Sequence, residues 1–295
     1  AGFLLEAYDY LKNKAGEKIA KTLYLYGQEI NLSTFAIAKI NMFLHGLDSA
    51  DIRRGDTLSN PQFLDEFGTI KKFDICVTNF PYSIKEWAYE SFATNKFGRL
   101  EGYDMPPVSN ADYAFILHII KSLNSNGRAG VVAPHGVLFR GGSEGRIREQ
   151  MIKNDLIEAV IAMPAKLFYT VSIPVCIIIF NKNKQESHKN KILFVNAENE
   201  YSDNKKQNIL RNQDIDKITR TFDDYKDVDK YACVVDTKEI GEENEYNLNV
   251  RRYVDSSEEE EIIDVSAVWQ ELKKLEKERE DIDKKVEGYL NELNY

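Results

Sequence analysis

Apolar and polar positions alternate along residues 1–197 in two different periods. Short runs of mostly apolar, often β-branched residues end at polar or turn residues, which is typical of buried strands. These runs cover 73–77, 130–134, 156–163 and 175–180. Between them, apolar residues recur every three or four positions, which predicts helices. The helical stretches cover 33–45, 112–123 and 143–153. The alternation predicts an α/β fold with a mostly parallel sheet.

Weaker signals complete this pattern. Residues 24–26 form a short strand candidate, and 51–58 predicts a third strand and its exit. Ser33 is the expected N-cap of the helix that follows the first of these strands. The apolar run 191–196 can pair with 175–180 as a hairpin.

The C-terminal stretch has a third pattern. From Val265 to Leu293 apolar residues alternate three and four positions apart, with one charged break at Arg279, which predicts a long helix with a heptad seam. Its apolar stripe needs a partner, which can be its own domain, another copy or a different subunit. We therefore predict an α/β domain over 1–197, a polar extension packed on it over 198–256, and a helical tail over 257–295.

Charge is distributed unevenly between these parts. The net charge is -9, from 39 basic and 48 acidic residues. Residues 255–295 hold 14 of the acidic and 6 of the basic side chains, so residues 1–254 are almost neutral at a net charge of -1. Neither part has the basic surface of a protein that grips DNA unaided. If DNA is a substrate, a local patch or another subunit must supply much of the phosphate contact.

The positions of the cysteines and the hydropathy of the chain indicate which class of protein this is. Three cysteines stand far apart, at 76, 176 and 233, so we expect neither a disulfide framework nor a metal cluster. No apolar run approaches the roughly 18 residues of a membrane span. We expect reduced thiols and a cytoplasmic location without a membrane partner.

The most informative stretch follows the strand at 73–77. In open α/β sheets, ligands bind beyond the carboxyl ends of strands. There Asn79 and the carbonyl of Phe80 offer two acceptors, Pro81 stiffens the loop, and Tyr82 offers a flat face for stacking. This set suits a planar substrate with an exocyclic amino group, whose delocalised lone pair is a poor nucleophile. Two acceptors on its N–H groups make that lone pair available and stabilise the positive charge that develops on nitrogen.

Asn79-Phe80-Pro81-Tyr82 resembles the Asn/Asp-Pro-Pro-Tyr/Phe motif of amino-group methyltransferases that use S-adenosylmethionine. Phe80 departs from the usual proline, but the motif's mechanism needs only the carbonyl at this position. The stretches 26–29, 38–46 and 246–254 resemble the modification (M) subunit of type I restriction–modification systems. The resemblance implies a Rossmann-like S-adenosylmethionine-dependent methyltransferase sheet with helices on both faces. It also implies methylation of the N6 amino group of adenine in DNA.

For the target base, the resemblance implies that Asn79 and the Phe80 carbonyl polarise the amine. It also implies that Tyr82 stacks on one face of a base flipped out of the duplex. An aromatic side chain packs on the other face in related enzymes. Phe168 is the candidate and Tyr169 the reserve, while core packing is the competing interpretation for Phe168.

For the cofactor, the resemblance implies that Glu29 holds the ribose diol and that Asp56 contacts the adenine amino group. The competing interpretation makes both of them turn residues. Residues 1–4 resemble the tail of a glycine-rich cofactor loop, which assigns Gly2 and Phe3 to cofactor binding together with Asn79. We therefore expect the first strand and most of that loop to precede Ala1. No metal is expected.

The implied partners are DNA, the specificity (S) subunit through the C-terminal helix, and the restriction (R) subunit in the larger complex. Three alternatives stay open from the sequence. The first is a different amino group as substrate, that of N4-cytosine or of a glutamine side chain. The second is a binding module without catalysis, and the third is a scaffold that assembles subunits through its tail. We expect the DNA recognition sequence to be set by another chain.

Overall fold

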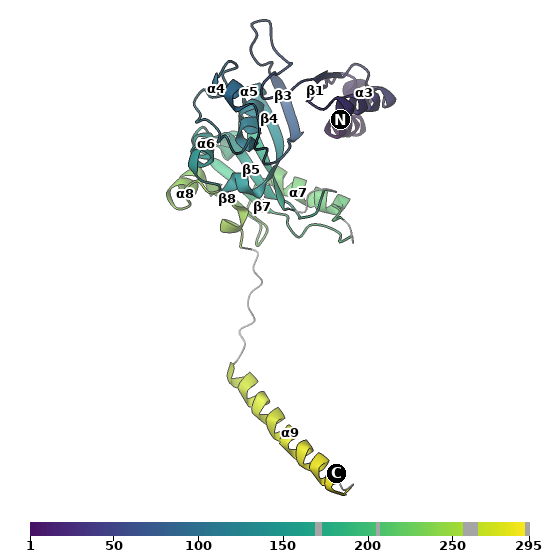
Figure 1. Cartoon of the computed structure of the whole chain (residues 1–295), viewed down its shortest axis with the longest axis vertical. Coiled ribbons are helices and arrows are strands. Elements are labelled where there is room, and N and C mark those ends of the chain that lie inside the picture. The colour runs from purple at the N-terminus through teal and green to yellow at the C-terminus, as the bar shows by residue number, and fades with distance from the viewer. Residues whose placement is uncertain (169–172, 205–206, 256–264, 293–295) are drawn as a thin grey trace. The chain divides into compact units, whose positions relative to one another are not determined.

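The computed structural model describes residues 1–168, 173–204, 207–255 and 265–292. The chain forms two compact units, Ala1–Asp255 and Ser256–Tyr295, and each is described by itself (Figure 1). The first unit holds a six-stranded sheet, a two-stranded sheet and the helices that pack on them. In its described part the second unit is one helix, α9 (Val265–Glu292). The predicted C-terminal helix is confirmed, and its expected last seam residue, Leu293, lies outside the described residues.

The six-stranded sheet is mixed. Its strands are β3 (Phe73–Asn79), β4 (Leu123–Pro134), β5 (Ile157–Ala162), β6 (Val175–Asn181), β7 (Lys191–Asn196) and β8 (Ala232–Asp236). They follow the order β3-β4-β6-β5-β7-β8. The pairs β3–β4 and β5–β7 are parallel, whereas β4–β6, β5–β6 and β7–β8 are antiparallel. The prediction of a mostly parallel sheet is wrong, because β6 inserts between β4 and β5 and runs against both.

The predicted hairpin between 175–180 and 191–196 is wrong as well. Strands β6 and β7 lie on opposite sides of β5 and pair with it rather than with each other. Every residue of β5 is buried. A direct β6–β7 pair would leave one edge of this buried strand without hydrogen-bond partners, which costs free energy in a protein interior.

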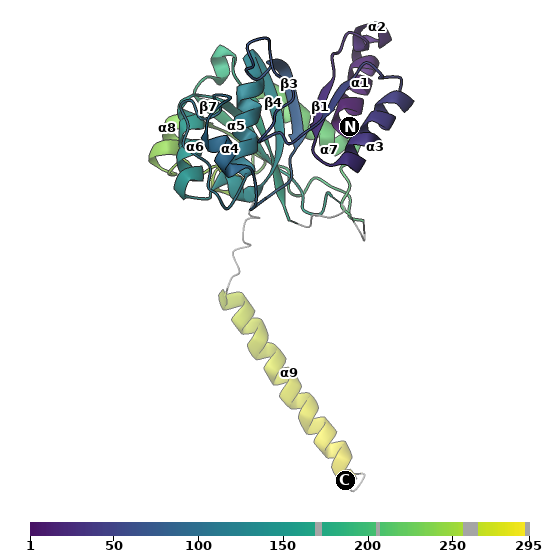
Figure 2. The same ribbon diagram turned by 45° about the horizontal axis from the view of Figure 1, so that its top comes forward.

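Helices cover both faces of the large sheet, as predicted (Figure 2). Their apolar side chains join two separate cores. Helices α5 (Asp112–Ser122), α6 (Gly142–Lys153) and α8 (Thr237–Glu242) contribute to the first core. Helix α7 (Asn212–Asp224) contributes Ile218 to the second. Because side chains alternate along a strand, Val160 of β5 joins the first core and Ile161 joins the second.

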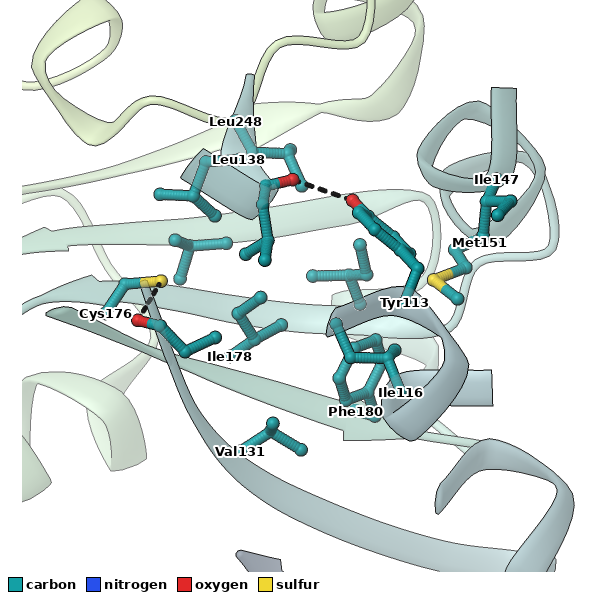
Figure 3. Packing of buried hydrophobic residues seen from close by; sticks show 14 of the residues in the cluster. Tyr113, Ile116, Val131, Leu138, Ile147, Met151, Cys176, Ile178, Phe180 and Leu248 are labelled. Atoms are coloured by element: carbon teal, nitrogen blue, oxygen red, sulfur yellow. Dashed lines mark hydrogen bonds between the residues drawn. The ribbon is translucent and has the colours of Figure 1, made fainter. Parts of the chain in front are cut away.

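The first core is closed by large side chains from α5 and α6 (Figure 3). Ile116, Ile147 and Met151 are almost completely buried against strand residues such as Phe180. Tyr113 is buried among them, and its hydroxyl donates a hydrogen bond of 2.7 Å to the carbonyl of Val137. A buried hydroxyl needs such a partner, so this bond fixes α5 against the segment that follows β4.

The two-stranded sheet pairs β1 (Tyr26–Glu29) in parallel with β2 (Asp51–Arg54). Helices α1 (Gly2–Ala15), α2 (Glu17–Ala20) and α3 (Leu32–Leu44) pack with it. The strand predicted at 24–26 begins two residues later than expected. The N-cap of α3 is Asn31 rather than Ser33, because the Asn31 side chain accepts the backbone N–H of Thr34 at 3.0 Å.

Strand β3 confirms the strand predicted at 73–77, but the expectation that it is buried is wrong. It lies at the edge of the six-stranded sheet, with β4 as its neighbour. Ile75 and Val77 share one face of the strand and are 71% and 41% exposed. An apolar run indicates a face suited to burial, but whether that face is covered depends on the elements packed on it.

Shorter elements connect these parts. They are α4 (Tyr89–Ala93) and the 3₁₀ turns η1 (His135–Leu138), η2 (Glu186–His188) and η3 (Val250–Arg252). Residues 207–255 supply α7, β8 and α8 to the same unit as the rest of the sheet. Within the part of the chain that the structure describes, no helix has the length and apolar character to cross a membrane.

Arg148 of α6 is a buried charge that holds three backbone segments together. Its side chain is 4% exposed. Its guanidinium donates to the carbonyls of Tyr246 at 2.7 Å, Arg140 at 2.9 Å and Val137 at 3.3 Å. A buried charge is tolerated only when its hydrogen bonds are made, so these carbonyls and Arg148 depend on one another.

Replacing Arg148 with Met should therefore lower the free energy of unfolding by about 3 kcal/mol, because buried carbonyls lose a charged donor. Urea unfolding measures this loss. Arg146→Met is the control on the same helix, since Arg146 makes an exposed pair with Asp104 and should cost less than about 1 kcal/mol. Equal losses in the two variants would contradict this role for Arg148.

His118 on α5 makes stability depend on pH. Its Nδ1 is buried without a hydrogen-bond partner among the described residues. Burial, assisted by the positive charges of Arg99 and Lys72, lowers the pKa of His118 to about 3. Below its ordinary pKa the unfolded chain takes up a proton that the folded chain does not. The contribution of His118 to the free energy of unfolding is thus fully present above about pH 6.5 and is lost as the pH falls toward 3.

Between pH 7 and pH 5 the wild-type chain should lose up to about 2 kcal/mol more unfolding free energy than His118→Gln. Urea titrations at the two pH values test this difference. His45→Gln, at the exposed end of α3, should behave as wild type. Identical pH profiles for wild type and His118→Gln would show that His118 is not the buried neutral group.

Candidate active site at the carboxyl end of strand β3

Asn79 is the last residue of β3, and its side chain is exposed. Tyr82 donates its hydroxyl to the Asn79 side-chain oxygen at 2.5 Å. Burial raises the pKa of Tyr82 to about 12, so the hydroxyl stays protonated and acts as a donor near neutral pH. An amide oxygen has two lone pairs. Tyr82 therefore orients the Asn79 amide and leaves a second acceptor direction for another N–H group.

Phe80 anchors the loop by its ring. It is 4% exposed and stacks on Phe115 of α5 with centroids 5.3 Å apart and planes 11° apart. It also meets Tyr82 edge to face at 5.9 Å. Pro81 between these two aromatics is exposed. The residue that departs from the expected proline thus fills a core position.

A buried charge network holds the residues after Tyr82. Asp112 has no exposed surface, and its carboxylate accepts the Ser83 backbone N–H at 2.7 Å. The same carboxylate pairs with Arg140 at 2.6 Å, and Arg140 also pairs with Glu144 in the first turn of α6. Ser83 has a positive φ of 54°, a conformation that needs outside support. Asp112 supplies that support.

Asp112 and Arg140 were not expected to shape the site. The sequence shows only an acidic residue in the first turn of a helix, where a carboxylate is common. One feature of the sequence could have indicated that Asp112 is buried. The rest of this helix is apolar on most sides, which implies burial of its first turn as well. Burial of a carboxylate requires a cation, and the sequence does not show which arginine supplies it.

Phe168 and Tyr82 are both partly buried and pack against the second core, and Tyr82 also packs against the first. The two rings make no aromatic contact with each other among the residues described. Tyr169, the reserve candidate, lies outside the described residues. The two side chains thus share a core against which they pack, and the stacking role of Phe168 stays a prediction.

Glu29 and Asp56 lie at the ends of neighbouring parallel strands. Glu29 is the last residue of β1, and one carboxylate oxygen accepts the Asn31 N–H at 2.7 Å. Asp56 follows β2 and accepts the Leu58 N–H at 2.9 Å and the Ser59 hydroxyl at 2.7 Å. Each carboxylate therefore shapes a turn. A carboxylate has about four acceptor directions, so these turn bonds leave room for further donors.

Gly2 and Phe3 occupy the first turn of α1. Phe3 is 46% exposed, and a Cβ added at Gly2 would meet nothing within 4 Å. Gly2 thus has open space where a side chain would lie. The small sheet joins the large one near the start of its strands, where Tyr26 contacts Phe73 at a ring distance of 5.3 Å.

Arg99 is a second residue that the sequence did not point to. It is 2% exposed, lies 3.9 Å over the ring of Phe92 and donates to the Thr57 carbonyl at 3.4 Å. Burial lowers its pKa to about 10, against the opposing effect of the Asp56 charge, so it keeps its positive charge near neutral pH. Arg99 thus supports the turn that presents Asp56. No local pattern in its polar surroundings predicts this.

The described residues contain no group of three or more His, Cys, Asp or Glu side chains able to hold a metal ion. The site has carboxylates at two adjacent strand ends. At the end of β3 it has an amide acceptor beside an aromatic ring. Acceptors at the carboxyl ends of strands in an open α/β sheet are typical of proteins that bind a nucleotide-like ligand there.

Comparison with known proteins defines the family. The sequence model described as N-6 DNA methylase matches residues 1–262. The type I restriction enzyme MjaVIII methylase subunit of Methanocaldococcus jannaschii is 40% identical over 281 residues, covering 92% of this chain and 48% of that protein. The MjaVII methylase subunit of the same organism is 37% identical, covering 97% of this chain and 49% of that protein.

A solved structure agrees with these relatives. The type I restriction–modification methyltransferase subunit of Streptococcus thermophilus superposes with a TM-score of 0.75 at 37% identity, covering 83% of this chain and 52% of that one. This chain belongs to the N-6 DNA methylase family, as the motifs indicated. It spans about half the length of the curated relatives it matches.

Replacing Asp112 with Ala should lower the unfolding free energy by about 3 to 5 kcal/mol, because Arg140 and the Ser83 N–H both lose a buried partner. Urea unfolding measures the loss, and hydrogen exchange at the Ser83 amide should accelerate. Asp104→Ala is the control, because its pair with Arg146 is partly exposed and should cost about 1 kcal/mol or less. Unchanged Ser83 exchange in Asp112→Ala would contradict the anchoring role.

Proposed function

We propose that this chain belongs to the modification subunit of a type I restriction–modification complex, an enzyme that methylates the N6 amino group of adenine in DNA with S-adenosylmethionine. The observation that carries this proposal is the loop Asn79–Tyr82, which combines an oriented amide acceptor, a protonated phenol and an aromatic face at the end of one strand. Family membership and the names of the relatives support it.

The loop fits the requirements of an exocyclic amine. Asn79 Oδ1 accepts one amine N–H in the direction that Tyr82 leaves open, and the Phe80 carbonyl accepts the other. Together they stabilise positive charge as it develops on nitrogen. Phe80 is suited to this role because its buried ring stacks on Phe115 and restricts the position of its backbone. Pro81 restricts the backbone that follows.

The target base must leave the duplex to reach this loop. Tyr82 stacks on one face of the base, and Phe168 is the proposed ring on the other. Their shared packing against the second core supports this pairing. The hydroxyl of Tyr82 is held by Asn79, which keeps the ring from rotating away when no base is present.

The donor set at the ends of β1 and β2 fits S-adenosylmethionine. Ribose hydroxyls and the adenine amino group are hydrogen-bond donors, and the carboxylates of Glu29 and Asp56 are acceptors on adjacent strands. Glu29 would hold the ribose and Asp56 the adenine, with Gly2, Phe3 and Asn79 toward the methionine part. When bound, this cofactor would supply an electrophilic methyl group.

The charge distribution fits a subunit that shares DNA binding with others. Residues 1–254 are almost neutral, so a local basic patch or another subunit would supply much of the phosphate contact in a complex. We propose the specificity subunit as the partner of α9 and the restriction subunit as a member of the larger complex. The enzyme would act in the cytoplasm, where its DNA substrate lies.

The proposal is tested with the complete native gene that encodes this chain, expressed with its neighbouring subunits in a host without DNA methylation. Nucleoside analysis of the host DNA should detect N6-methyladenine. Asn79→Ala should reduce it at least about a hundredfold, because one acceptor for the developing charge is lost. Asn13→Ala, on the exposed surface of α1, should leave it unchanged.

Other outcomes separate the alternatives. N4-methylcytosine in place of N6-methyladenine would change the substrate and keep the loop chemistry. A folded, assembled complex that produces no methylated nucleoside would show a non-catalytic assembly role. Methylation that persists in Asn79→Ala would remove Asn79 from the reaction.

A further inference from the structure

Helix α9 carries an apolar stripe that its own unit leaves uncovered. The helix is 28 residues long, and its large apolar side chains recur at heptad spacing. Those on the stripe are between 44% and 58% exposed: Val268, Leu272, Leu275, Ile282 and Val286. A helix of this kind is stabilised by a second helix that packs against the stripe.

The residues beside the stripe carry one sign of charge in its central part. In a heptad with Leu272 and Val286 at position a and Leu275 and Ile282 at position d, positions e and g border the seam. From 271 to 283 all of these border positions are acidic: Glu271, Glu276, Glu278 and Asp283. The lysines of this stretch lie at positions b, c and f, away from the seam: Lys273, Lys274 and Lys277.

This arrangement opposes pairing between two copies of the helix. In a parallel, in-register pair, Glu271 would face Glu276 of the second copy, and Glu278 would face Asp283. In a fully overlapping antiparallel pair, Glu276 would face Glu276 and Glu278 would face Glu278 of the second copy, whereas Glu271 would face Lys285. The like charges at the central border positions select against a pair in both orientations.

Arg279 adds a second bias against self-pairing. It occupies an a position within the seam and is 77% exposed at its side chain. Its ion pair with Asp283 is long, at 3.8 Å between Nε and Oδ2. Two parallel copies would bring two guanidinium groups together inside an apolar seam, which is costly. A carboxylate on a different helix would satisfy Arg279 with a charge-assisted hydrogen bond.

We propose that α9 selects a helix of a different protein by charge: a partner with an apolar seam, lysine or arginine at the border positions, and a carboxylate opposite Arg279. The inference rests on the subunit contact proposed above and adds the chemistry by which the partner is recognised. A second copy of this chain and the chain's own first unit are the competing occupants.

The test uses the full chain and two synthetic helical peptides of equal length. Both peptides have Ile and Leu in the seam and one Glu in register with Arg279. The first has Lys at every border position, and the second has Glu there. Fluorescence anisotropy at about 100 mM salt should show the lysine-bordered peptide binding at least about tenfold more tightly, and this preference should shrink as salt rises.

Matched variants test which positions of α9 cause the preference for the lysine-bordered peptide. The triple variant E271K/E276K/E278K should abolish or reverse the preference. The triple variant E280K/D281K/E287K changes the net charge equally but alters positions b and c, so it should keep the preference. Leu275→Asp should abolish binding of the lysine-bordered peptide, which shows that the seam is used.

Equal affinity for the two peptides, or the same change in both triple variants, would overturn the proposal. The proposal would also be overturned if light scattering showed that the wild-type chain is a dimer and that Leu275→Asp is a monomer. The occupant of the stripe would then be a second copy of the chain. These readouts do not involve methylation. Loss of methyladenine with intact peptide selectivity would overturn the catalytic proposal alone, and methylation without selectivity would overturn this one alone.

Discussion

The buried carboxylate of Asp112 is the interaction on which the geometry of the candidate site depends. It accepts the Ser83 N–H directly after the acceptor loop and pairs with Arg140. Arg140 in turn pairs with Glu144 at the start of α6. One set of charges therefore connects the loop after β3 with the first turns of two helices. Because each buried charge would be left unpaired if another moved, the loop and the helices must keep their positions together.

Two aromatic residues of the loop have different structural roles. The ring of Phe80 lies in the core against Phe115, while Tyr82 directs its hydroxyl to Asn79. Phe80 thus anchors the loop and Tyr82 orients the Asn79 amide. Neither contact uses the second acceptor direction of Asn79, which stays open to another N–H group. Arg99 has a comparable supporting role at the other sheet, where its charge lies under the turn of Asp56. In both places a buried charge lies behind a surface acceptor.

The two units of the chain differ in the physical basis of their interactions. The first is nearly neutral and buries its apolar side chains in its own cores. The second holds most of the net negative charge and exposes its apolar stripe. A helix that combines exposed apolar residues with a single sign of charge along the central part of its borders gains stability from a partner and selectivity from the charge of that partner.

Local pattern in the sequence was sufficient for several features. The strand predicted at 73–77, the α/β alternation, the acceptor loop and the seam of α9 all follow from residue type and spacing, because strand and helix periods are properties of neighbouring residues. The family was also evident, since Asn79-Phe80-Pro81-Tyr82 and the stretches around it are contiguous. The candidate residues of the loop needed no tertiary information to be found.

Other features were decided only by the tertiary structure. The place of β6 between β4 and β5, the exposure of Ile75, and the pairing of Asp112 with Arg140 all join residues far apart in the chain. Periodicity states that a face is apolar or that a carboxylate is present, but it carries no information about which distant element packs there. That choice depends on the free energy of the whole packed core, in which each strand edge and each buried charge must find a partner at once.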